Sequence, residues 1–244
     1  MPQAAMTILP PLPLVRRLGL AALLLGLMSG TAGPALALDA PNTKRPFDIL
    51  VNGVKVGRQF LTFHHEGKVL VVENEIYIVA PEVWHNLADR ALELLRVGKQ
   101  VSDRYMLRCR EVWRDGALAE VTTDVDNYDE PAEVDLDATP NGLMVDGPAG
   151  RLPAPPGLVP SSLWQFEMTK APVILDLDSG RILNVHFSQG AQEPLAAGSE
   201  DVPALHVTAS GELSRDLWYG HDGLLLRQQY LDKKGQLLEF RYAP

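Results

Sequence analysis

The side chains best suited to chemistry are one glutamate in an otherwise apolar strand pattern, four tryptophans and two histidines. Glu111 lies in a run with the alternation of a half-buried strand, and this alternation places it on one face with Tyr105, Leu107, Cys109 and Trp113. We favour the interpretation that Glu111 leans out at a bulge or bonds a backbone amide, because ladder irregularities are common near turns. The alternative is a carboxylate that lines a cavity.

The tryptophans suggest a binding surface for an apolar ligand. Gathered at one rim of a curved sheet, such aromatic side chains would grip an acyl chain, although ordinary core packing is the favoured alternative. The residues predicted to bind a ligand on this basis are Trp84, Leu87, Tyr105, Leu107, Trp113, Trp164 and Trp218.

Signals for catalysis or metal binding are weak. His186 and His206 fall in separate expected strands and would meet only across a sheet, and two histidines without a third ligand are a poor zinc signal. The acidic run 124–137 fails the EF-hand spacing, because Tyr128 and Asp129 occupy its fifth and sixth positions. Nucleophile-elbow, phosphate-loop and dinucleotide-binding motifs are missing from the sequence. We therefore predict no catalytic residue, metal or cofactor.

The first residues have the three-part pattern of a secretory signal peptide. Arg16 and Arg17 precede the apolar run 18–28, and Ala35-Leu36-Ala37 supplies a cleavage site after Ala37. The apolar run is too short to span a bilayer, so we expect a signal peptide over 1–37, no stable membrane anchor after cleavage, and a periplasmic or secreted protein.

Net charge and cysteine content limit the classes of partner and the disulfides that this chain can have. The net charge of −9 disfavours binding to nucleic acid through long-range attraction. Cys109 is the sole cysteine, so no intrachain disulfide forms, and its place on an apolar strand face predicts a buried thiol.

The remaining pattern predicts one antiparallel β domain over 38–244. Extended runs are separated by turn signals such as Asn52-Gly53 and Asp115-Gly116, which suit tight hairpins. Residues 81–97 have helical spacing, and the proline-rich stretch 148–160 predicts a surface loop. We expect a mainly β fold: a curved antiparallel sheet or half-barrel of roughly ten strands with one amphipathic helix on its concave side.

The sequence also resembles an uncharacterised family of secreted bacterial proteins known as a domain of unknown function. The residues that carry this resemblance are Phe47-Asp48-Ile49, Asn52-Gly53, Gly57, Glu111-x-Trp113-x-Asp115-Gly116-x-Leu118, Ser162-x-Trp164, Leu175-Asp176, Ser179-Gly180, Trp218-Tyr219 and Asp222-Gly223. The resemblance implies the fold rather than an activity. More remotely, a curved sheet with a covering helix is similar to the half-barrels of periplasmic lipoprotein carriers, an analogy of architecture alone.

Three hypotheses of function follow. The leading one is a soluble periplasmic protein that binds a hydrophobic small molecule or lipid in a half-barrel. The second is a structural or adaptor module with a solid core and an unidentified protein partner. The third is a hydrolase-like enzyme that uses His186 or His206 with a nearby carboxylate.

Overall fold

The computed structural model describes residues 36–79, 104–127, 130–140, 142–197, 200–232 and 234–244. Most of the expected signal peptide lies outside these residues, and so does the expected helix over 81–97 with Trp84 and Leu87.

Strands dominate the part of the chain that is described, with a single 3-10 helix between them. Sixteen strands are found there, against roughly ten expected, because several contain only two or three residues. Their bounds are β1 (Thr43–Val51), β2 (Val54–Glu66), β3 (Val69–Val79), β4 (Arg104–Arg114), β5 (Ala117–Asn127), β6 (Glu130–Thr139), β7 (Gly142–Asp146), β8 (Leu152–Pro153), β9 (Val159–Pro160), β10 (Val173–Leu175), β11 (Ile182–Phe187), β12 (Ala191–Ala197), β13 (Glu200–Gly211), β14 (Arg215–Tyr219), β15 (Leu225–Leu231) and β16 (Leu237–Tyr242). The 3-10 helix, η2, is Phe166–Lys170.

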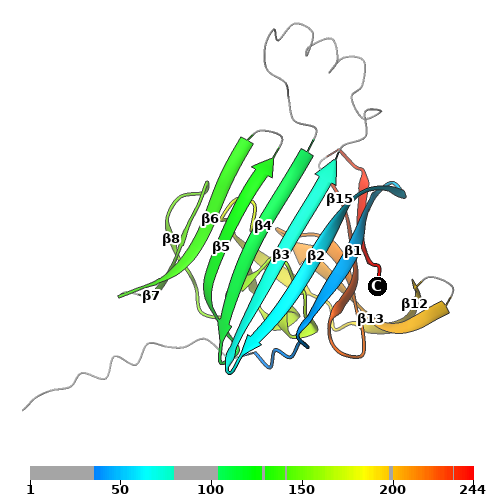
Figure 1. Cartoon of the computed structure of the whole chain (residues 1–244), viewed down its shortest axis with the longest axis horizontal. Coiled ribbons are helices and arrows are strands. Elements are labelled where there is room, and N and C mark those ends of the chain that lie inside the picture. Colours follow the sequence, from blue (N-terminus) through cyan, green and yellow to red (C-terminus); the bar gives the residue numbers. More distant parts are fainter. Residues whose placement is uncertain (1–35, 80–103, 128–129, 141, 198–199, 233) are drawn as a thin grey trace, which may run out of the picture. The chain divides into compact units, whose positions relative to one another are not determined.

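The strands form one unclosed, curved sheet, shown in Figure 1. Its order is β8-β7-β6-β5-β4-β3-β2-β1-β16-β15-β14-β13-β11-β10-β9, with β12 paired to β13. The pairs are antiparallel except β9 with β10. The expected turn at Asp115-Gly116 joins β4 to β5, and both of its residues have the positive φ angles that such a turn requires. The predicted mainly β, antiparallel character is confirmed.

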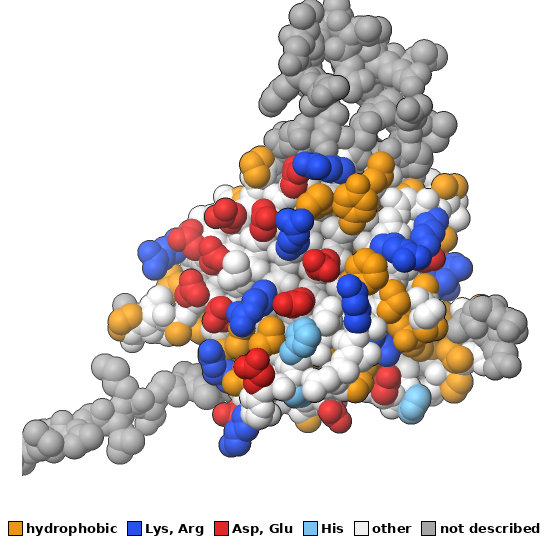
Figure 2. Space-filling view, in the orientation of Figure 1, with side chains coloured by type: hydrophobic (Ala, Val, Ile, Leu, Met, Phe, Trp, Pro, Cys, Tyr) orange, Lys and Arg blue, Asp and Glu red, His pale blue; other side chains and the backbone are white. Residues whose placement is uncertain are grey.

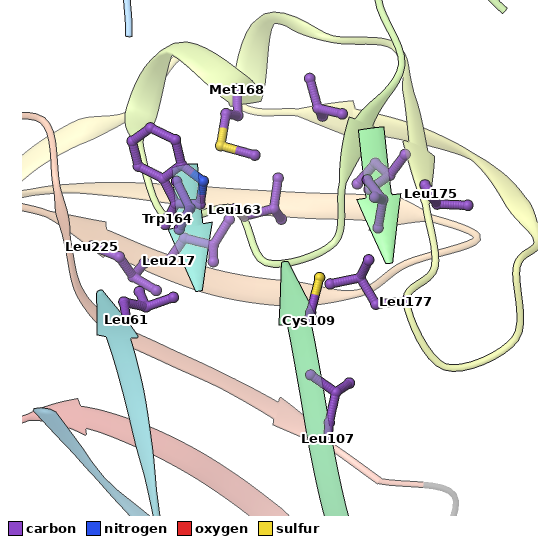
Figure 3. Packing of buried hydrophobic residues seen from close by; sticks show 14 of the residues in the cluster. Leu61, Leu107, Cys109, Leu163, Trp164, Met168, Leu175, Leu177, Leu217 and Leu225 are labelled. Atoms are coloured by element: carbon purple, nitrogen blue, oxygen red, sulfur yellow. The ribbon is translucent and has the colours of Figure 1, made fainter. Parts of the chain in front are cut away.

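The core lies between strands from the two halves of this order. Figure 3 shows Leu61 and Leu107 from β2 and β4 in the same cluster as Leu217 and Leu225 from β14 and β15. Residues 158–177, including η2, add buried side chains to this cluster; among them are Leu163, Trp164, Met168, Leu175 and Leu177. This irregular segment therefore packs against the inner face of the sheet.

The proline-rich stretch is only partly at the surface. Its residues 148–157 are exposed or half-buried, as predicted for a surface loop. Leu158, Val159 and Pro160 are instead buried, because β9 pairs with β10 and enters the core. The prediction of a surface loop over all of 148–160 is thus wrong for its last three residues.

The outer face of strands β2 to β5 is polar. Figure 2 shows acidic and basic side chains interspersed on the visible face. Arg110 pairs with Glu120 at 2.9 Å and Arg104 with Asp126 at 3.2 Å, both across β4 and β5. This side of the sheet therefore faces water. Among the described residues, no helix has the length and apolarity needed to cross a bilayer.

Candidate functional site

A fully buried carboxylate joins the β4–β5 hairpin to the turn that follows β9. Glu111 is 0% exposed. Its Oε2 accepts hydrogen bonds from the indole Nε1 of Trp113 and of Trp164, each at 3.0 Å. Its Oε1 accepts a bond of 2.6 Å from the hydroxyl of Ser162. Three side-chain donors from two distant parts of the chain thus converge on one carboxylate.

The local backbone geometry orients these donors toward the carboxylate. The β4–β5 register shifts between Val112 and Trp113, next to Glu111, so a ladder irregularity is present as expected. On the facing segment, Leu163 has a φ of 44°, an uncommon value for a side-chain-bearing residue. Its carbonyl accepts a hydrogen bond of 3.0 Å from the Tyr219 hydroxyl, which anchors the turn that presents Ser162 and Trp164.

The favoured prediction for Glu111 is wrong, because the side chain neither leans out nor bonds a backbone amide. Burial raises the pKa of Glu111 above its ordinary value of 4.5, and the bonds from Ser162, Trp164 and Trp113 oppose that rise. All three donors are neutral, so the carboxylate is stabilised by hydrogen bonds alone. Glu111 thus links the β4–β5 hairpin to the segment after β9, and we call Glu111 with Trp113, Ser162 and Trp164 the Glu111 clamp.

Next to this clamp lies a cavity of about 210 Å³ that is partly open to solvent. Ser162 belongs to its wall, so the clamp and the cavity share a residue. Polar groups from five parts of the chain also line it: Gln59, Asn74, Ser161, Arg215 and Gln228. Gln59, Asn74 and Gln228 are only 1%, 2% and 4% exposed, so these polar side chains are part of the core.

Apolar side chains lie among these polar groups: Ile76 pairs with Gln59 across β2 and β3, and Phe240 pairs with Gln228 across β15 and β16. The apolar part of the lining consists of Ile76, Ile78, Leu107, Leu177, Leu238 and Phe240. Tyr105, Tyr230 and Asp178 complete the lining, and the Tyr105 hydroxyl donates a short hydrogen bond to the Asp178 carboxylate. Desolvation raises the pKa of both Tyr105 and Asp178, and the nearby Asp178 charge raises that of Tyr105 further. A molecule in this cavity would therefore meet both apolar and polar side chains.

Arg215 is the cation of the cavity wall. One of its terminal nitrogens donates to the Ser161 carbonyl and to Gln228 Oε1, each at 3.1 Å. Its guanidinium carbon also lies 4.9 Å from the centre of the Tyr230 ring, a cation–π contact. These neutral partners fix the orientation of the guanidinium without cancelling its charge.

Comparison with known proteins places the chain in a family. Residues 97–243 match the family described as a domain of unknown function, DUF6134. The chain belongs to this family. The predicted resemblance to a domain-of-unknown-function family is confirmed, and the matched range contains Glu111, Trp113, Ser162 and Trp164. Two short motifs on which the resemblance was based, Glu-x-Trp and Ser-x-Trp, therefore form one hydrogen-bonded cluster in this member of DUF6134.

One solved structure is similar to the DUF6134 chain. It is described as a beta-barrel-like protein of domain of unknown function DUF1849 from Brucella abortus, with 9% sequence identity and a TM-score of 0.47. The similarity covers 82% of this chain and 94% of that one. A search among curated proteins found no match.

The structure separates the residues predicted to bind a ligand into three groups. Tyr105 and Leu107 line the cavity. Trp113 and Trp164 are buried beside it, with ring centres 6.2 Å apart, and they serve the Glu111 clamp. Trp218 belongs to a separate small cluster with Leu195 and Ala204. The described tryptophans therefore do not form the expected aromatic rim.

The two histidines considered for catalysis are not brought together. His186 is opposite Ser210, which is four residues from His206 along β13, or roughly 13 Å at the rise of a strand. His206 stacks on Trp218, and its Nε2 lies 2.9 Å from Asp216 Oδ1. It is thus a member of a surface cluster remote from His186, and the pair forms no shared site.

The polar residues that line the cavity were not predicted from the sequence. In the sequence, Asn74 alternates with Val72 and Ile76 on the apolar face of its strand, and such an amide among apolar residues is a signal of a buried polar site. Gln59 and Gln228 give the same signal, each buried within a strand. Arg215 and Asp178 gave no comparable signal, because charged residues near turns are ordinarily solvated.

Proposed function

We propose that this protein binds a small amphipathic molecule in the cavity between β2, β3, β4 and the segment around Ser161. The observation that carries the proposal is the mixed lining, in which apolar side chains such as Ile76 and Leu107 lie among polar groups such as Arg215 and Gln228. Ligand pockets typically combine an apolar wall with a few convergent polar groups.

A solely structural core would be built differently. Protein interiors are close-packed, and a cavity left in them is normally apolar or small. Placing a guanidinium and three buried amides around a cavity costs desolvation energy that an apolar lining would avoid. Polar groups held at that cost are typical of functional sites.

The volume limits the size of the ligand. About 210 Å³ is below the roughly 300–1,000 Å³ of pockets for drug-sized molecules. This narrows the hydrophobic or lipid ligand expected from the sequence to a compact molecule with a short apolar part. We further propose that the protein acts after export, and the charged and apolar regions of residues 16–28 support this.

Filling the cavity tests the proposal. Ile76→Trp adds bulk to the cavity lining, while Tyr77→Trp places the same indole on the outer face, where Tyr77 is 50% exposed. Ligand-detected NMR would screen both variants and the wild type against four- to eight-carbon carboxylates, amines, alcohols and amino acids. We expect wild type and Tyr77→Trp to bind a common subset of these probes, and Ile76→Trp to lose it.

Two results would contradict binding in this cavity. One is that no probe binds the wild-type protein, which would favour the structural or adaptor module. The other is that Ile76→Trp, folded by circular dichroism, binds the same probes as the wild type. The hydrolase-like alternative has no support from the positions of His186 and His206.

A further inference from the structure

The cavity carries two opposite charges that do not pair with each other. Arg215 donates hydrogen bonds only to neutral acceptors, the Ser161 carbonyl and the Gln228 amide. Asp178 is exposed and accepts its bond from the Tyr105 hydroxyl, which is also neutral. Within the described ranges, neither charge takes part in an ion pair. A complementary occupant therefore carries one negative and one positive group.

Unused hydrogen-bonding atoms support the same conclusion. The Nε of Arg215 is buried and, among the described residues, has no acceptor. The Oε1 of Gln59 is buried without a donor, although its Nε2 donates to Asn74 Oδ1 at 2.8 Å. Both residues line the cavity. Because unpaired buried polar atoms are costly, an occupant that supplies an acceptor to one and a donor to the other is favoured.

We propose that the occupant is a small zwitterion, a single α-amino acid with an apolar side chain. Its carboxylate binds Arg215, its ammonium group binds Asp178 and the amide oxygen of Gln59, and its side chain packs against Ile76 and Leu107. This inference rests on the proposed ligand-binding function and specifies the class of ligand.

Size and charge both exclude the nearest alternatives. At about 30 Å³ per molecule of liquid water, 210 Å³ holds the volume of about seven waters, which suits one amino acid rather than a peptide. A simple carboxylic acid would leave the buried Gln59 Oε1 without a donor, and a simple amine would leave the buried Arg215 Nε without an acceptor. Only an occupant with both groups pairs both charges.

Three probes that share one apolar group separate these alternatives. L-leucine carries both charges, 4-methylpentanoate lacks the ammonium group, and 3-methylbutylamine lacks the carboxylate. Isothermal titration calorimetry of the wild-type protein at pH 7 is expected to show leucine binding at least about tenfold more tightly than either analogue, because each charged hydrogen-bonding group contributes to affinity.

Matched variants assign each charge to its residue. Arg215→Gln is expected to remove the preference for leucine over 3-methylbutylamine, because the carboxylate loses its partner. Asp178→Asn is expected to remove the preference for leucine over 4-methylpentanoate, because the ammonium group loses its partner. Arg151→Gln and Asp137→Asn change the same residue types at exposed positions outside the cavity and are expected to bind leucine as the wild type does. The comparison of the three probes on wild-type protein is decisive even if one variant fails to fold.

Other outcomes overturn the inference in distinguishable ways. If 4-methylpentanoate or the amine binds as tightly as leucine and Ile76→Trp abolishes that binding, the zwitterion is excluded while the cavity remains a binding site. If none of the three binds but another probe of the screen does, the ligand class is again wrong. If no probe of either set binds, the proposed function fails as well.

Discussion

Replacing Glu111 by leucine should destabilise the protein strongly, because it removes the common acceptor of three buried donors. Trp113 and Trp164 are 1% and 0% exposed, so neither indole N–H can turn to water. A buried donor left without a partner costs about 1–3 kcal/mol, so the two indoles together predict a loss of about 2–6 kcal/mol. The Ser162 hydroxyl can rotate, and we assign it no cost.

Glu111→Gln is the matched comparison. Its amide oxygen can accept from both indoles, while its amide nitrogen donates to the Ser162 oxygen in the reverse direction. We expect a loss no larger than about 1 kcal/mol, within the range of a single neutral hydrogen bond. Urea unfolding followed by far-ultraviolet circular dichroism measures the stability of both variants. Making Glu111→Leu in the wild-type and in a Trp164→Phe background measures the energetic coupling between Glu111 and Trp164.

The pH dependence gives an independent check. Burial raises the pKa of Glu111 in the folded protein above its ordinary value of 4.5, so the folded state holds this proton more tightly than the unfolded state does. The free energy of unfolding of the wild type, relative to Glu111→Gln, should therefore fall as pH rises from about 4.5 through the folded-state pKa. A difference that rises with pH would show that the three hydrogen bonds outweigh burial and would refute the predicted pH dependence. Glu111→Leu as stable as Glu111→Gln would refute the clamp.

Three further predictions concern other parts of the chain. Gly211→Ala should destabilise more than Gly53→Ala: both have positive φ, which costs on the order of 1–3 kcal/mol, but only at Gly211 would the new Cβ lie 2.8 Å from the Asn184 carbonyl oxygen, and urea unfolding compares them. Cys109, which is buried and whose thiol pKa burial raises, should react with Ellman's reagent only as fast as the protein unfolds; rapid labelling of folded protein would contradict its placement. Mass analysis of the exported protein should give an N-terminus at Leu38; retention of residues 1–37 would show that the signal is not cleaved.

The sequence predicted the antiparallel fold well because its signals are local. Alternation in β3 and β4 and turn residues such as Asp115-Gly116 depend on neighbours within a few positions. The role of Glu111 could not be predicted in this way, since two of its three donors come from residues 162 and 164, which are 51 and 53 positions away. The alternation did place Glu111 inward, and the preference for an outward interpretation followed from the frequency of ladder irregularities near turns.

The cavity was hidden for a similar reason. Tyr105 and Leu107 were predicted to contact a ligand and do line it, but their polar counterparts come from β2, β3, β14, β15 and two turns. Their convergence depends on how strands far apart in the order fold toward each other. The tryptophans drew attention to large apolar groups, whereas the buried amides of Gln59, Asn74 and Gln228 marked the site.

A crystal structure of the wild-type protein soaked in a mixture of short carboxylates, amines and apolar amino acids, at a resolution that orders water, tests ligand binding most directly. The account predicts electron density for one organic molecule in the cavity, with its apolar end against Ile76 and Leu107 and its charged end against Arg215. A cavity that holds only water, or one closed by its own side chains, would contradict it.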